Sequence, residues 1–144
     1  MNIDTINPLV LAYIGDAIYE LKIRGKLIDK KINKVNDLQK ECTKYVSAKG
    51  QSYFIEKFIS DNILSDEEVE IYKRARNSKV NSHPSNTDIL TYKRATGLEA
   101  VFGFLYLTNN MNRIDELIEL VMEDLWLYMV KMSQEKLLKI IKKL

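Results

Sequence analysis

The sequence predicts an all-α protein, and three observations carry that prediction. The 144 residues include only five glycines and two prolines, too few for a fold with many tight turns. Hydrophobic residues make up 46% of the chain, enough to fill the core of one domain. Residues 9–21 and 97–107 are apolar on almost every side of a helix, as in buried helices. We therefore expect a single helical domain over residues 1–144.

The first two helices are predicted from their start signals and their apolar spacing. Asn7 is a good helix cap and Pro8 suits the first helical turn, so a helix should begin there and end near Gly25. A second, amphipathic helix is expected from about Val35 to Glu56, with an interruption at Gly50.

The rest of the chain predicts three more helices and one long loop. Ser65 and Glu68 form the pattern of a capping box, which starts a helix that runs to about Ala75. The polar stretch 76–87 is the long loop, and such loops in compact domains are often functional. The last two helices are expected from about residue 88 to 109 and from about residue 113 onward.

Charges are unevenly distributed along the chain. Residues 22–49 hold nine Lys or Arg against three Asp or Glu, and residues 73–94 hold six against one. Residues 115–124 hold five acids and no base. This separation fits a basic face for a polyanion, and it also fits ordinary solvated helix surfaces.

The single cysteine, Cys42, excludes an intramolecular disulfide, and one histidine, His83, is too few for a cysteine-rich zinc site. We interpret Cys42 as a small core residue; the alternative of a catalytic pair with His83 has no support in the residues around either. The polar N-terminus is unlike a secretory signal, and no stretch reaches the ~20 apolar residues that span a bilayer. We expect a cytoplasmic protein without a membrane partner.

Asp16 and Glu99 stand in the middle of the two apolar stretches. An ionised carboxylate in such surroundings needs a partner, because burying it alone is unfavourable. One solution is a divalent cation, since Mg²⁺ and Mn²⁺ prefer oxygen ligands. The other is a basic side chain from another helix, and the residues leave both solutions open.

Two glycines favour a close crossing of the two helices. Gly15 precedes Asp16, and Gly103 lies one turn after Glu99. A glycine inside a helix costs about 1 kcal/mol relative to alanine, which is tolerable where two backbones approach closely. Such a crossing would bring both carboxylates to one metal ion. Glu20, one turn after Asp16 on the same face, is a further candidate metal ligand.

These stretches resemble a known family. Residues 13–20, Tyr-Ile-Gly-Asp-Ala-Ile-Tyr-Glu, resemble the signature helix of the ribonuclease III catalytic domain, and residues 96–103, Thr-Gly-Leu-Glu-Ala-Val-Phe-Gly, resemble its second acidic helix. The resemblance covers roughly residues 5–125 and is strongest to the Mini-ribonuclease III branch, which consists of the catalytic domain alone. It implies the helical bundle of that domain, followed by a basic helical tail over residues 126–144.

The resemblance implies a metal-dependent endoribonuclease that hydrolyses phosphodiesters of double-stranded RNA. Asp16 matches the central catalytic aspartate of the family and Glu99 its last essential glutamate, with Mg²⁺ as the cofactor and Mn²⁺ as a substitute. The branch is associated with maturation of large-subunit ribosomal RNA precursors. The family acts as a homodimer, for which Tyr13 and Tyr19 are candidate interface residues.

The chain departs from the wider family at two positions. Ala12 and Thr96 stand where that family has further acids, so the number of metal ions is open. Glu20 or Asp88 would be the compensating acid, although Asp88 also fits the start of a helix. The missing acids support the main alternative, a non-catalytic helical RNA-binding or ribosome-associated protein of the same fold. A helical adaptor for other proteins explains the apolar helices but not the acids within them.

The resemblance also includes no double-stranded-RNA-binding domain, so we expect the catalytic domain to grip the duplex itself. A-form RNA is recognised mainly through its shape, phosphates and 2′-hydroxyls. The candidate RNA contacts are the basic residues around the long loop, with ordinary surface charge as the alternative for each: Arg74, Arg76, Lys79, Lys93 and Arg94.

Overall fold

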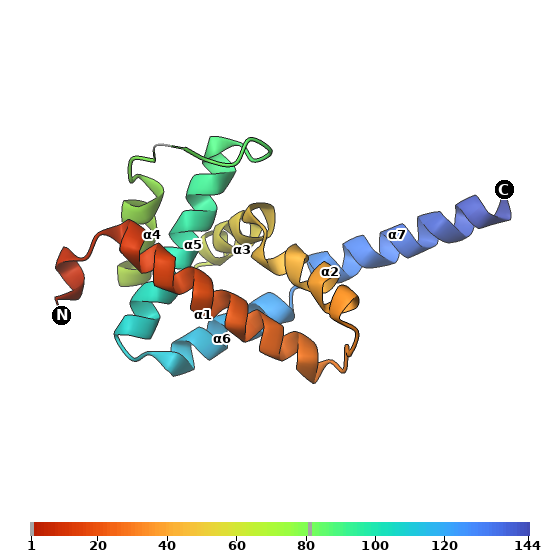
Figure 1. Cartoon of the computed structure of the whole chain (residues 1–144), viewed down its shortest axis with the longest axis horizontal. Coiled ribbons are helices and arrows are strands. Elements are labelled where there is room, and N and C mark those ends of the chain that lie inside the picture. Colours follow the sequence, from red (N-terminus) through yellow and green to blue (C-terminus); the bar gives the residue numbers. More distant parts are fainter. Residues whose placement is uncertain (1, 81) are drawn as a thin grey trace.

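The computed structural model describes residues 2–80 and 82–144, except for the side chains of residues 125–132. Over these residues all regular secondary structure is helical, which confirms the all-α prediction (Figure 1). The elements are η1 (Ile3–Thr5), α1 (Pro8–Asp29), α2 (Val35–Val46), α3 (Ala48–Ser60), α4 (Asp66–Arg76), α5 (Ile89–Leu107), α6 (Met111–Met122) and α7 (Leu125–Lys143).

Helices α1 and α5 form the centre of the molecule. They cross and pack against each other, α3 and α4 also pack against α5, and α2 and α6 pack against α1 (Figure 1). Buried side chains from α1 to α6 join into one hydrophobic cluster, in which Tyr19, Phe54 and Phe102 are the largest fully buried residues. Cys42 is buried in this cluster, as predicted, whereas His83 is exposed in the loop.

The predicted helix starts are present. Asn7 accepts a hydrogen bond from the backbone N–H of Leu9 at 2.9 Å, and Asp88 accepts one from Thr91 at 2.9 Å. Ser65 and Glu68 form the complete capping box at the start of α4. Asp88 is therefore the N-cap of α5, which confirms the interpretation that this residue starts a helix.

Three predicted helix boundaries are wrong. Helix α1 continues past Gly25 to Asp29, because its core-facing side remains apolar beyond the glycine. The predicted helix 35–56 is divided at Ser47, whose hydroxyl accepts a hydrogen bond from the backbone N–H of Gly50 and starts α3. The last predicted helix is likewise two helices, α6 and α7.

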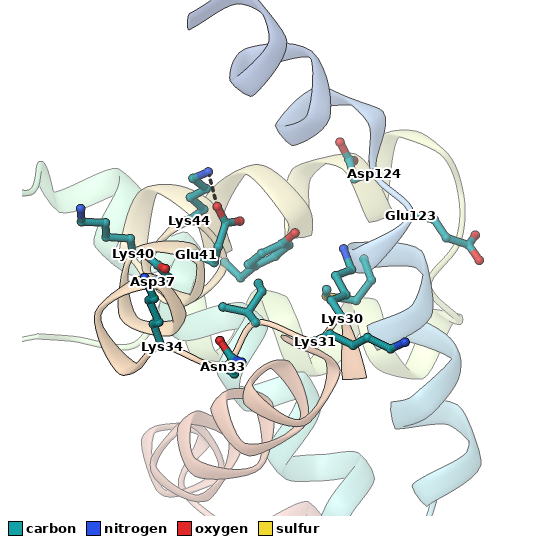
Figure 2. Close-up of a pocket in the computed structure, with 13 residues that line it drawn as sticks. Lys30, Lys31, Asn33, Lys34, Asp37, Lys40, Glu41, Lys44, Glu123 and Asp124 are labelled. Carbon is teal, nitrogen blue, oxygen red and sulfur yellow. Dashed lines mark hydrogen bonds and ion pairs between the residues drawn. The ribbon is translucent and has the colours of Figure 1, made fainter. Parts of the chain in front are cut away.

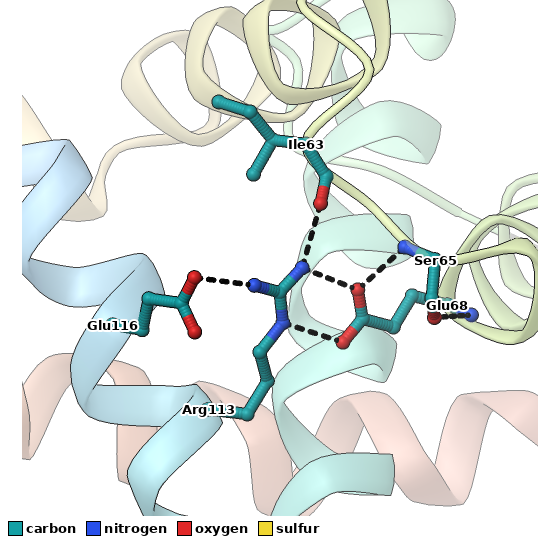
Figure 3. A network of polar contacts seen from close by, with 5 residues as sticks. All are labelled: Ile63, Ser65, Glu68, Arg113 and Glu116. Carbon is teal, nitrogen blue, oxygen red and sulfur yellow. Dashed lines mark hydrogen bonds and ion pairs between the residues drawn. The ribbon is translucent and has the colours of Figure 1, made fainter.

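A buried ion pair fixes α4 to α6. Glu68 is 4% exposed, and its carboxylate accepts hydrogen bonds from Nε and Nη2 of Arg113, both at 2.9 Å (Figure 3). Nη2 also donates to the carbonyl oxygen of Ile63 at 2.7 Å. Burial alone would raise the pKa of Glu68, but the hydrogen bonds from Arg113 and Ser65 hold it below its usual value. Every charge in this network therefore has a partner.

Helix α7 leaves the helical body as a single projecting element (Figure 1). It corresponds to the predicted basic tail, of which the side chains of residues 126–132 lie outside the described part. Side chains 133–144 are exposed throughout. Among the described residues, none of the helices has the length and apolar content to cross a membrane.

Candidate active site

Helices α1 and α5 touch backbone to backbone at two glycines. A Cβ atom built on Gly15 would overlap the carbonyl oxygen of Glu99, and one built on Gly103 would overlap the carbonyl oxygen of Leu11. Any larger residue at either position would push the helices apart. The close crossing predicted from these glycines is therefore present, and it brings Asp16 beside Glu99.

The carboxyl groups of Asp16 and Glu99 face each other across the crossing. Burial, hydrogen bonding to Asp16 and the negative charge of Asp16 raise the pKa of Glu99 to about 9. At neutral pH and without a cation, Glu99 is therefore protonated. None of the ion pairs among the described residues involves either acid, so the alternative of a basic partner for each is not what the structure shows.

The prediction that α1 is buried on every side is wrong, and this changes the position of Asp16. Asp16 is exposed and Glu99 is partly exposed, so the pair lies at the surface end of the crossing rather than inside the core. One side of α1 packs on α5, while apolar residues on another side, including Val10, Tyr13 and Leu21, remain in solvent. The apolar residues of α1 therefore lie on two sides of the helix: one side packs in the core, and the other is exposed to solvent.

The two carboxylates line an open hollow of about 540 Å³. Its remaining lining is apolar or carries a hydroxyl group, without any basic side chain: Leu9, Ala12, Tyr13, Ile14, Ala17, Val80, Tyr92 and Thr96. A hollow of this kind has room for water and for a phosphate group next to the acids. Among the residues that the structure describes, the two acids are the only charged groups that line it, so it should attract a cation.

Ala12 and Thr96 both line this hollow. The hydroxyl of Thr96 donates to the carbonyl oxygen of Tyr92 at 3.0 Å, so it is turned back onto its own helix. The two positions at which the wider family has further acids are therefore at the site, but they supply no carboxylate here. In the described part of the chain, no group of three or more acidic, histidine or cysteine side chains is arranged to hold a metal ion.

Neither Glu20 nor Asp88 lines the hollow that contains the pair. The carboxylate of Glu20 lies 3.5 Å from Nη2 of Arg24, one turn further along α1. Asp88 bonds both the backbone N–H and the hydroxyl of Thr91, and these bonds hold its pKa below the usual value. Both acids have local roles in their own helices.

The five predicted RNA contacts lie in different environments. Arg94 forms an ion pair with Glu56 at 2.8 Å, and the guanidinium of Arg76 lies 5.2 Å from the ring centre of Tyr72. Arg74, Lys79 and Lys93 form no ion pair among the described residues. All five come from the end of α4, the loop or the start of α5, and of these segments the loop and α5 also line the hollow.

Among the residues of the hollow that sequence reasoning missed are Val80 and Tyr92. Val80 belongs to the loop, and the ring of Tyr92 lies 6.3 Å from the ring of His83 in the same loop. The available signal was the helical spacing, since Tyr92, Thr96 and Glu99 recur every three or four residues along α5. The path of the loop carries no such periodic signal.

A second, larger hollow of about 820 Å³ lies where the end of α1, helix α2 and the end of α6 meet (Figure 2). Its lining mixes acids with the lysines 30, 31, 34, 40 and 44. Lys44 and Glu41 form an ion pair there at 2.9 Å. This hollow is therefore lined by charges of both signs, whereas the charged groups that line the smaller hollow, among the described residues, are both acids.

The chain was compared with known families, sequences and structures. The family model described as the ribonuclease III domain matches residues 9–110. A Mini-ribonuclease 3 of Clostridium tetani is 47% identical over 81% of this chain and 76% of its own length. A Mini-ribonuclease 3 of Streptococcus pneumoniae is 42% identical over 82% of this chain and 92% of its own.

A crystal structure of a protein from Fusobacterium nucleatum has the same fold, with a TM-score of 0.73 and 37% identity. The match covers 83% of this chain and 93% of that one. The matched family segment contains both helices that carry Asp16 and Glu99. The chain therefore belongs to the ribonuclease III family, among relatives of the Mini-ribonuclease 3 type, and it is an endoribonuclease.

Proposed function

We propose that the protein cuts double-stranded RNA at the Asp16–Glu99 pair and uses Mg²⁺, or Mn²⁺ as a substitute. The observation that carries this proposal is the pair itself: two facing acids that form no ion pair with a basic side chain among the described residues, one of them with a pKa raised to about 9. Such a pair disfavours its own ionisation until a cation arrives. The family as a whole acts on double-stranded RNA and generally depends on divalent metal ions, which fits this chemistry.

The residues fit a magnesium ion with few protein ligands. Mg²⁺ is usually held by one or two carboxylates and keeps several waters. Asp16 and Glu99 supply the two carboxylates, and the hollow leaves space for the waters. When bound, the cation polarises the phosphate and activates a water molecule. The chain's own part is to fix both carboxylates at the crossing, where Gly15 and Gly103 allow no other spacing.

The RNA duplex is expected to lie across the hollow and the basic segments beside it. Arg74, Arg76, Lys79 and Lys93 are the proposed phosphate contacts, because no acid among the described residues neutralises them. Arg94 is a weaker candidate, since its guanidinium is already paired with Glu56.

A homodimer is proposed through the exposed apolar strip on α1, defined here as Val10, Tyr13 and Leu21. Tyr13 is 82% exposed, which is unusual for a large aromatic residue outside an interface. It also lines the hollow, so a second copy on this strip would lie at the edge of the site. Tyr19, the other candidate, is a core residue: it is fully buried, and its hydroxyl donates to the carbonyl oxygen of Tyr45 at 2.7 Å.

Three further assignments complete the proposal. The substrate is a precursor of large-subunit ribosomal RNA, the protein acts in the cytoplasm, and residues 1–144 form one catalytic domain with a basic helical tail. They rest on the likeness to the Mini-ribonuclease 3 relatives and on the single hydrophobic cluster formed by α1–α6.

The metal assignment is tested by thermal unfolding during a Mg²⁺ titration. A ligand that binds only the folded state raises Tm with its concentration. We expect Mg²⁺ to raise the Tm of the wild type and to leave Glu99→Gln unchanged, with Glu20→Gln responding like the wild type. A wild type that cleaves duplex RNA but shows the same Mg²⁺ response as Glu99→Gln would remove this pair as the metal site. A wild type that binds duplexes without cutting them would support the non-catalytic alternative.

A further inference from the structure

The described half of α7 separates apolar from basic side chains. Leu137, Leu138, Ile140 and Ile141 are between 55% and 58% exposed, and Leu144 is fully exposed. At about 100° per residue, these five side chains fall within an arc of roughly 160°. The opposite arc carries four lysines, at positions 136, 139, 142 and 143, with Glu135 as the single acid.

RNA alone does not account for this helix. Phosphates would pair with the lysines, but the five apolar side chains would remain in water. Exposed apolar clusters of this kind normally mark a surface that another body covers. A second copy of the helix would cover the apolar face, but the four lysines on the opposite arc would point away from it and gain no anionic partner.

We propose that residues 133–144 bind the surface of an anionic lipid bilayer. Such a surface is the one partner that meets both faces at once, because acyl chains take up the apolar side and anionic headgroups attract the lysines. The helix would lie in the plane of the headgroups and would not cross the membrane. This replaces our expectation of no membrane partner, which rested on the missing membrane-spanning segment, a requirement that does not apply to a helix lying on the surface.

The position of α7 suits this role. It projects from the helical body (Figure 1), and neither the hollow nor the residues around it belong to residues 133–144. Binding through this helix would therefore leave Asp16 and Glu99 accessible to RNA. The proposal is independent of the nuclease activity, because it concerns different residues and a different ligand.

The test is flotation of the full chain with vesicles. Vesicles of phosphatidylcholine and phosphatidylglycerol in equal parts are compared with vesicles of phosphatidylcholine alone. We expect the wild type to float with the anionic vesicles only. The double variant Leu138→Gln with Ile141→Gln should lose at least about tenfold in binding, since it removes apolar area without changing charge. The double variant Lys139→Gln with Lys142→Gln should bind more weakly and respond less to salt.

The matched control is Ile28→Gln with Val35→Gln, two exposed apolar residues of the helical body, and it should float like the wild type. A wild type that stays unbound, or an apolar variant that floats unchanged, overturns the proposal. It is also overturned if the apolar variant changes only the oligomer mass in sedimentation, which identifies a second copy as the partner. Loss of duplex RNA binding in the lysine variant, without any flotation of the wild type, would identify RNA instead.

Discussion

Glu68 and Glu99 are two glutamates withdrawn from solvent whose surroundings are opposite. The carboxylate of Glu68 accepts hydrogen bonds from Nε and Nη2 of Arg113 and from the backbone N–H of Ser65, and these bonds lower its pKa. Glu99 faces another acid across a helix crossing, and its pKa is raised to about 9. One site is complete within the chain, and the other is incomplete without a cation.

The difference separates a group that stabilises the fold from one that is kept for chemistry. A satisfied buried charge holds elements together, as Glu68 holds α4 to α6. A buried acid without a partner of opposite charge lowers the stability of the fold, and such a group is typical of sites that bind a ligand or take part in a reaction. The same substitution, Glu→Gln, should therefore have opposite effects at the two positions, and this pair of variants tests the comparison.

The largest effect is expected on RNA cleavage. Glu99→Gln should lower the cleavage rate by on the order of 10³-fold or more, because it removes one of two metal-holding carboxylates. Glu68→Gln should keep a rate near that of the wild type at temperatures where it remains folded. Single-turnover cleavage of a long duplex measures both. Comparable losses in the two variants would contradict the separation of roles.

The next largest effect is expected on stability, with opposite signs. Glu68→Gln removes the buried partner of Arg113, which keeps only its ion pair with the exposed Glu116, and should lower stability by about 2–4 kcal/mol, or Tm by about 10 °C. Folding at pH 8 requires Glu99 to take up a proton, which Glu99→Gln avoids, so this variant should raise stability by about 1 kcal/mol at that pH. Thermal unfolding in the absence of divalent ions measures both changes. A fall in Tm for Glu99→Gln would show that its carboxyl group is structurally required.

The pH dependence of stability should sharpen the contrast. The folded pKa of Glu68 is lowered, so its contribution is present above its unfolded value near 4.3 and is lost as the pH falls through the folded value. The folded pKa of Glu99 is raised, so the folded state holds its proton more tightly and stability falls as pH rises from about 5 to 9. Between pH 5 and 9 the wild type should lose Tm, and Glu99→Gln should lose less. Parallel curves for the two proteins would argue against the raised pKa.

The smallest effect is expected at the arginines beside the hollow. Arg74→Ala should weaken duplex binding and reduce the slope of log K against log salt concentration by about 0.7–0.9. Arg94→Ala, the matched control, should change the slope less, because that guanidinium is already paired with Glu56. Binding titrations at several salt concentrations, made in an Asp16→Asn background to prevent cutting, measure both. A larger change in the salt dependence of binding for Arg94→Ala than for Arg74→Ala would contradict the assignment of Arg74 as the stronger phosphate contact.

The crossing of α1 and α5 could be predicted because its signal is local. A glycine inside an apolar helix lowers helix stability, so Gly15 and Gly103 indicate a close approach of two backbones. Asp16 and Glu99 lie within one turn of these glycines, and the same approach therefore places the two acids together. The capping residues Asn7, Ser65 and Asp88 likewise act within a few residues of their position. These features depend on short-range chemistry that one sequence contains.

Other features depend on distant partners and could not be predicted in the same way. The apolar residues of α1 do not reveal which side meets α5 and which stays in solvent, so the exposure of Tyr13 and the burial of Tyr19 were indistinguishable. Arg113 lies 45 positions from Glu68, and nothing near either residue indicates their pairing. The same holds for Arg94 and Glu56, whose ion pair separates one predicted RNA contact from its neighbours.

The most direct measurement is cleavage of a long RNA duplex with and without Mg²⁺ by the wild type, Asp16→Asn and Glu68→Gln. Asp16→Asn keeps the shape of the side chain and removes the charge that completes the pair with Glu99. We expect Mg²⁺-dependent cutting by the wild type and by Glu68→Gln, and none by a fully folded Asp16→Asn. Cutting by Asp16→Asn at the wild-type rate would show that the Asp16–Glu99 pair is not the catalytic centre.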